Sequence, residues 1–176
     1  MSLIRYCAAM GFLYAAGAAP AFADDCKPVT DSIIVTVKTP YKMTLTRTGK
    51  DGKPETNYLV QTPNAKYVQT GGRWITMPSS SQDLLDQLNA TMKTAKMECH
   101  RLGTEMVSGQ SAAIYSMHVE NEGTVSDSKV WLSSDRLPLK SEVVVNGTTI
   151  TSIYDYANVQ PPLDAAPLGL PAPAKK

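Results

Sequence analysis

VVVNGTTI, residues 143 to 150, is the most informative stretch of this chain. An Asn-Gly pair between two runs of β-branched residues is typical of a two-residue β-hairpin with a type I′ turn. Asn146 and Gly147 would form that turn, with strands over residues 139–145 and 148–156 on either side. The stretch therefore predicts antiparallel β-structure near the C-terminal end.

Similar short strands are expected through most of the chain. Tyr41, Met43 and Leu45 alternate with polar residues, which is the period of a half-buried strand. Gly- and Pro-containing breaks at 49–54, 63–64 and 71–72 separate further strands. The other expected strands are 55–61, 65–70, 73–77, 97–106, 111–120 and 128–133. About nine or ten strands of this kind predict a mainly β, α+β fold whose antiparallel sheet curls or closes.

One helix is expected over residues 80–96. Ser80 precedes an acidic residue by three positions, as in a capping box, and five apolar residues follow at helical spacing. This helix either packs on the sheet or forms a movable lid over a cavity. The segment 27–37 is ambiguous, because its apolar residues have helical spacing but most of them are β-branched.

Residues 1–23 have the pattern of a secretory signal peptide. Arg5 precedes an apolar run over residues 7–18, and the segment ends in Ala21-Phe22-Ala23. The apolar run is shorter than the roughly 20 residues that span a bilayer, so we expect cleavage after Ala23 and no permanent membrane anchor. A single domain would then occupy residues 24–158, followed by a Pro/Ala-rich, disordered tail at 159–176.

Cys26 and Cys99 remain after removal of the signal peptide. Two cysteines in an exported chain are most simply explained by one disulfide, worth about 4 kcal/mol for a loop of this length. The alternative is a metal site that adds His100 and His118, but adjacent strand residues such as Cys99 and His100 point to opposite faces. We expect the disulfide and no metal.

Composition excludes several function classes. The 17 basic and 16 acidic residues nearly balance, which does not favour nucleic-acid binding. The sequence contains no glycine-rich phosphate loop and no GxSxG or HExxH motif. We therefore expect no catalytic residues, no cofactor and no enzyme activity. The methionines are scattered singly, which favours flexible apolar packing over a copper site.

The C-terminal half resembles a known family. The segments VWLSSDRLPLK, residues 130–140, and SIYDYANV, residues 152–159, are similar to the Leu-Pro-Leu-basic and closing-strand segments of the periplasmic LolA/LolB-like superfamily. That superfamily includes lipoprotein carriers and the RseB/MucB stress sensors. The resemblance implies a half-open β-barrel, a strongly curved antiparallel sheet with a helix covering its concave face. It also implies a periplasmic location, and it favours a Gram-negative source.

The resemblance implies a hydrophobic ligand, such as a lipid or a lipoprotein acyl chain, held in the barrel cavity. The alternative is a module of the same fold that acts in protein-protein interaction or envelope-stress sensing and binds an envelope protein. For Trp74 and Trp131, packing in the core is the competing explanation. The residues that we expect to form the cavity wall are Tyr41, Met43, Tyr67, Trp74, Leu84, Leu88 and Trp131.

Overall fold

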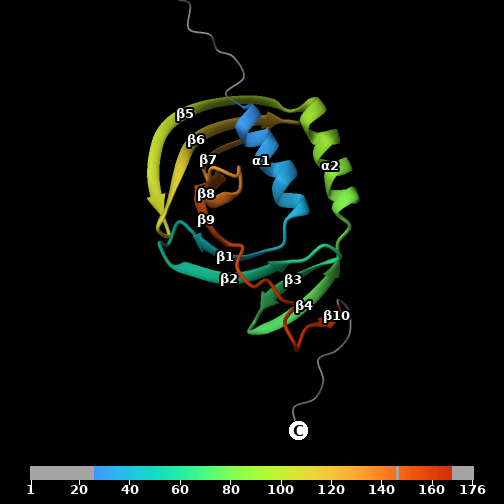
Figure 1. Cartoon of the computed structure of the whole chain (residues 1–176). Helices are drawn as coiled ribbons and strands as arrows, with labels where there is room; N and C mark the ends of the chain where they lie inside the picture. The colour runs from blue at the N-terminus through green and yellow to red at the C-terminus, as the bar shows by residue number, and fades with distance from the viewer. Residues whose placement is uncertain (1–25, 146, 168–176) are drawn as a thin grey trace, which may run out of the picture.

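The computed structural model describes residues 26–145 and 147–167. Ten strands form a single sheet in the order β10-β4-β3-β2-β1-β9-β8-β7-β6-β5. The sheet curves around α1, and α2 lies across its open side (Figure 1). This is a half-open α+β barrel with helices on the concave face, which confirms the fold class expected from the sequence. The predicted signal peptide and all the residues after 167 lie outside the described residues.

The elements have the following bounds. They are α1 (Lys27–Lys38), β1 (Tyr41–Thr48), β2 (Pro54–Gln61), β3 (Ala65–Thr70), β4 (Arg73–Pro78), α2 (Ser81–Thr94), β5 (Lys96–Val107), β6 (Gln110–Asn121), β7 (Thr124–Leu132), β8 (Pro138–Val145), β9 (Thr148–Asp155) and β10 (Ala166–Pro167). Neither helix in the described parts of the chain is long and apolar enough to cross a membrane.

Antiparallel pairing joins every pair of neighbouring strands among β1 to β9. β8 and β9 pair with Val145 opposite Thr148, which confirms the two-residue hairpin. Asn146 is outside the described residues, so the turn type stays a prediction, although Gly147 has a φ of 77°. β1 pairs with both β2 and β9, and this brings the first and last long strands together.

The ambiguous segment after Cys26 is the helix α1. Pro28 occupies its first turn, where a missing N–H costs no helical hydrogen bond. Val29 and Ser32 are buried against the sheet, so tertiary packing outweighs the weak helix propensity of the β-branched residues. At α2, Ser80 is the N-cap and its Oγ accepts hydrogen bonds from the backbone N–H groups of Gln82 and Asp83. This confirms the predicted start of the second helix.

Part of the segment expected to be disordered is paired in the sheet. Ala166 and Pro167 form β10 and run parallel to Ile75 and Thr76 of β4. These two residues lie within the segment 159–176 that we expect to be a disordered tail, and the extent of that tail stays a prediction. The pairing is possible because β4 offers an unpaired edge, and an edge is where a sheet accepts proline.

Candidate ligand cavity

A cavity of about 320 Å³ lies between the two helices and the concave face of the sheet. Its lining is mostly apolar, and it is partly open to solvent. The volume is at the lower end of the range for small-molecule sites. The lining residues are Val29, Ser32, Ile33, Thr36, Val37, Tyr41, Gln61, Lys66, Leu84, Met117, Ser128, Lys129, Val130, Pro138, Ser141, Val143 and Tyr154.

One long wall of the cavity is a face of α1. Val29, Ile33 and Val37 are spaced four residues apart and therefore lie on one side of the helix. Ser32 and Thr36 lie beside them, and their hydroxyls donate to the carbonyl oxygens of Val29 and Ser32 at 2.7 Å. Because these hydroxyls are satisfied within the helix, the wall behaves as a largely apolar surface.

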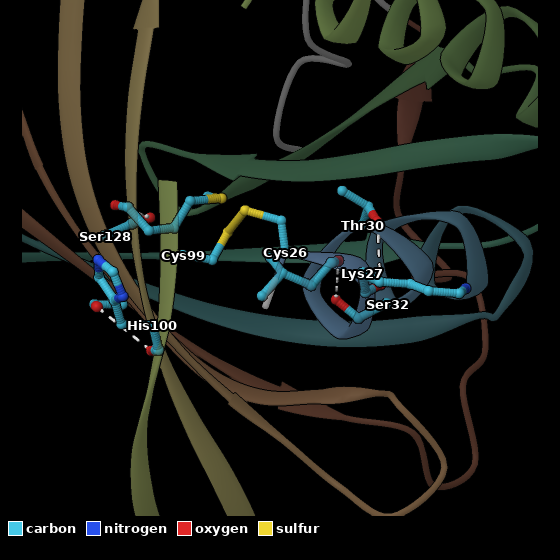
Figure 2. Close-up of a disulfide and its surroundings, with 10 residues drawn as sticks. Cys26, Lys27, Thr30, Ser32, Cys99, His100 and Ser128 are labelled. Atoms are coloured by element: carbon cyan, nitrogen blue, oxygen red, sulfur yellow. Dashed lines mark hydrogen bonds between the residues drawn. A yellow bond between two sulfur atoms is a disulfide. The ribbon is translucent and has the colours of Figure 1, made fainter. Parts of the chain in front are cut away.

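A disulfide fixes the start of this wall to the sheet. Cys26, which precedes α1, is bonded to Cys99 of β5, with 5.0 Å between their Cα atoms (Figure 2). The predicted disulfide is confirmed, and it consumes both sulfurs of the alternative metal site. In residues 26–145 and 147–167, no three His, Cys, Asp or Glu side chains are arranged to hold a metal ion. Cys99 also packs with Val29, Tyr115 and Leu132 in a buried cluster.

Three tyrosines pack together at the β1 side of the cavity. The ring centroids of Tyr41 and Tyr154 are 5.4 Å apart, and Tyr156 stacks on Tyr154 at 6.4 Å. Tyr156 Oη donates a 2.7 Å hydrogen bond to the carbonyl of Pro138. Burial raises the pKa of Tyr41 to about 12, helped by the neighbouring Tyr154. Burial also raises the pKa of Tyr154 and of Tyr156, so all three phenols are neutral at physiological pH.

Two polar side chains line the same side of the cavity. Gln61 is 3% exposed; its Nε2 donates to the carbonyls of Thr62 and Ala65, but its buried Oε1 accepts no hydrogen bond. An unpaired buried acceptor costs about 1–3 kcal/mol. Lys66 lies opposite Gln61 on β3 and is half-buried. Among the ion pairs of the described residues, none involves Lys66.

The structure brings some of the expected wall residues to the cavity. Tyr41 and Leu84 line it. Met43 lies on the same face as Tyr41, opposite Tyr154, but is not among the lining residues. Leu88 is half-buried one turn beyond Leu84 on α2 and does not line the cavity either. These two positions are next to the cavity but are not part of its wall.

The other expected wall residues lie on the convex face. Tyr67 is adjacent in sequence to Lys66, which lines the cavity, so strand alternation directs Tyr67 away from it. Trp74 pairs with Gln69, which shares the face of Tyr67. These two aromatic residues therefore do not line the described cavity.

Trp131 also lies on the convex face, because its neighbour Val130 lines the cavity. It is 5% exposed and packs with Val107, Ala112 and Leu139. The Lys140 ammonium lies 4.2 Å from its ring centroid. Trp131 therefore packs in the core, as in the competing explanation for this residue, and does not line the cavity.

Sequence reasoning missed the polar lining residues and the contribution of α1. Gln61 is the register partner of Tyr41, and Lys66 is the register partner of Gln61. The alternation of β1 and the turn at 63–64 indicate that residues of three strands can share one face. Placing Gln61 and Lys66 beside Tyr41 also requires the register of the two hairpins, which a single sequence does not give.

The convex face carries a separate group of charges around His118. Its Nδ1 lies 2.7 Å from Asp127 Oδ1, and its Nε2 lies 3.6 Å from Glu120 Oε1. The hydrogen bond with Asp127 raises the pKa of His118, and Glu120 adds to this, whereas desolvation opposes it. This histidine is therefore a partly exposed sheet residue held by carboxylates.

The fold and the cavity define the class of this molecule: a half-open α+β barrel with a partly open, mostly apolar chamber under two helices. No protein-family model matches the chain, and no curated protein matches it.

Solved structures with a similar fold include lipoprotein LppX of Mycobacterium tuberculosis, at 13% identity and a TM-score of 0.46 over 81% of this chain and 100% of that one. LprF of Mycobacterium bovis matches at 11% identity and a TM-score of 0.47, over 81% and 98% of the two chains. MucB, solved in complex with MucA, matches at 14% identity and a TM-score of 0.48, over 80% and 61%.

Proposed function

We propose that this protein is a non-enzymatic, exported periplasmic protein that binds a lipid, an acyl chain or another hydrophobic molecule between α1 and the sheet. The observation that carries the proposal is the mostly apolar cavity of about 320 Å³ at the concave face. A curved sheet with helices on one face leaves a space that its own side chains do not fill, and apolar ligands gain free energy by leaving water for it.

The chemistry of the lining supports binding over catalysis. None of the lining residues is a histidine, a cysteine, an aspartate or a glutamate. General acid-base catalysis most often uses a histidine or a carboxylate, and a serine or threonine nucleophile is activated by a neighbouring base. The lining hydroxyls of Ser32 and Thr36 donate hydrogen bonds to α1 carbonyls.

The test is a binding measurement with a matched pair of variants. Protein purified from its own periplasm is extracted for lipid, and the delipidated protein is titrated with the neutral fluorophore Nile red. Leu84→Ala and Leu88→Ala each remove one half-buried leucine from the same face of α2, but only Leu84 lines the cavity. We expect Leu84→Ala to weaken Nile red binding several-fold and Leu88→Ala to leave it unchanged. Protein that is consistently empty and does not bind Nile red would contradict the proposal.

A second candidate function, binding of an envelope protein, is favoured by a different feature. β5 is the last strand of the sheet, with β6 as its only partner in the described part of the chain. Leu102 and Met106 on this edge are 52% and 64% exposed. An extended segment of a partner protein can pair with such an edge through backbone hydrogen bonds. Recovery of a stoichiometric polypeptide with the protein from envelope extract, lost in the Leu102→Asp and Met106→Asp variants, would support this alternative.

A further inference from the structure

We infer that the ligand is amphipathic: its apolar chain lies along α1 toward the disulfide, and an anionic head group lies at Lys66 and Gln61. This inference rests on the proposed binding function and adds the chemical class of the ligand. It follows from how the polar and apolar lining residues are distributed between the two ends of the cavity.

The end of the cavity near the disulfide is mostly apolar. Ser128 also lines it, whereas Lys129, between Ser128 and Val130, is exposed and by strand alternation points to the convex face. Val29 lies in the first turn of α1 and packs against Cys99. Met117 and Val130 line the cavity and pack against the same cluster. From Val29 to Val37 the helix rises about 12 Å, which sets the length of the wall available to an apolar chain.

The opposite end is formed where several elements begin or end. α1 ends near Val37, whose carbonyl accepts a 3.2 Å hydrogen bond from Ser81 at the start of α2. β1 begins at Tyr41, β2 ends at Gln61, and β3 begins one residue before Lys66. Register places Tyr41 opposite Gln61 and Gln61 opposite Lys66 on the concave face. The polar lining groups of three strands therefore meet at one end of the cavity.

These groups favour an anion. The Lys66 ammonium forms no ion pair with a carboxylate of the described residues, and the cavity lining contains no acidic residue. An anionic head would find a cation without a competing counter-charge, whereas a cationic head would find no carboxylate. The neutral Tyr41 phenol keeps its O–H as a further donor at this end.

Gln61 requires a hydrogen-bond donor from the ligand, whereas Lys66 requires an anionic acceptor. Its Oε1 is buried without a donor although its Nε2 is satisfied by two carbonyls. A ligand hydroxyl or N–H beside the anionic group would supply the missing hydrogen bond. A fatty acid offers only the anion, whereas a phosphoglycerol head offers both the anion and hydroxyl donors. Fatty acids and phosphoglycerol lipids both supply the anion, and the experiment below distinguishes between these two kinds of ligand.

The experiment compares four probes with short chains by competition against Nile red on the full, delipidated protein. The probes are dodecanoate, dodecanol, dodecylamine and 1-dodecanoyl-lysophosphatidylglycerol. We expect dodecanoate to bind about tenfold more tightly than dodecanol, as one charge-assisted hydrogen bond implies, and dodecylamine to bind most weakly. Tighter binding of the lysophospholipid than of dodecanoate would identify the phosphoglycerol head as the better match.

Variants assign the effect to residues. Lys66→Gln should remove the tenfold preference for dodecanoate and leave dodecanol within about twofold, whereas Lys93→Gln, an exposed lysine on α2, should change neither. Gln61→Leu should weaken the lysophospholipid and spare dodecanoate. Thermal unfolding of each variant shows whether it is folded. Equal binding of acid, alcohol and amine, or no effect of Lys66→Gln, overturns the inference and leaves the proposed function standing. Failure of all four probes and of Nile red overturns the proposed function.

Discussion

Trp131 on β7 donates a 2.8 Å hydrogen bond from Nε1 to Oε2 of Glu105 on β5, across the intervening strand β6. The indole is buried on the convex face, with Lys140 over its ring. The bond joins strands that are not neighbours in the sheet. It ties the outer strand β5 to β7 on the side opposite the ligand cavity.

This relationship predicts that Trp131 contributes to stability and not to ligand binding. Trp131→Phe should lower the free energy of unfolding by about 1–2 kcal/mol, because the hydrogen bond and part of the packed volume are lost. Urea unfolding measures the change, and Nile red affinity should stay within twofold of the parent. Glu105→Gln, which keeps an acceptor oxygen, is the matched control and should cost less. Loss of Nile red binding in a Trp131→Phe protein of parental stability would place this residue in the ligand site.

The disulfide leads to a second prediction. Cys26→Ser with Cys99→Ser should lower the free energy of unfolding by about 4 kcal/mol, since the bond closes a loop with a sequence separation of 73. Urea unfolding of the double variant, compared with the oxidised and reduced parent, measures this. The reduced parent should resemble the double variant. Equal unfolding midpoints for the oxidised and reduced parent would contradict the prediction.

Features encoded in short stretches of sequence were predictable. The 143–150 hairpin depends on an Asn-Gly pair, and the start of α2 depends on the hydroxyl of Ser80; both act within a few residues. The identity of α1 was not predictable in this way. Its β-branched residues allow either state, and the burial of Val29 beside Cys99, far along the chain, favours the helix.

The sequence also did not reveal which face of each strand is concave. Alternation separates the residues of a strand into two sets, but the direction of sheet curvature decides which set faces the helices. Tyr41 belongs to the concave set, whereas Tyr67, Trp74 and Trp131 are large aromatic residues on the convex face. Lys66 was missed because a lysine that alternates with an aromatic residue in a strand is normally assigned to the face exposed to solvent.

His118 gives a prediction for pH dependence. Its pKa is raised above the ordinary 6.5, first by the hydrogen bond with Asp127. The contribution of this pair to stability should be fully present below pH 6.5 and should be lost as the pH rises through the raised folded pKa. An NMR titration of the His118 ring protons measures the folded pKa. Asp127→Asn should bring the pKa of His118 closer to 6.5. An unchanged His118 titration in Asp127→Asn would contradict this.

The buried phenols predict a loss of stability in alkali. An unfolded tyrosine ionises near pH 10, whereas burial raises the pKa of Tyr41 in the folded protein to about 12. Between these values the folded state holds a proton that the unfolded state has lost, so stability falls as the pH rises. Tyr41→Phe removes this proton and should reduce the loss between pH 10 and 11 by about 1 kcal/mol relative to the parent. Urea unfolding at both pH values measures the difference. Because every other ionisable group is shared by the two proteins, an equal loss in both would show that Tyr41 titrates alike in the folded and unfolded states.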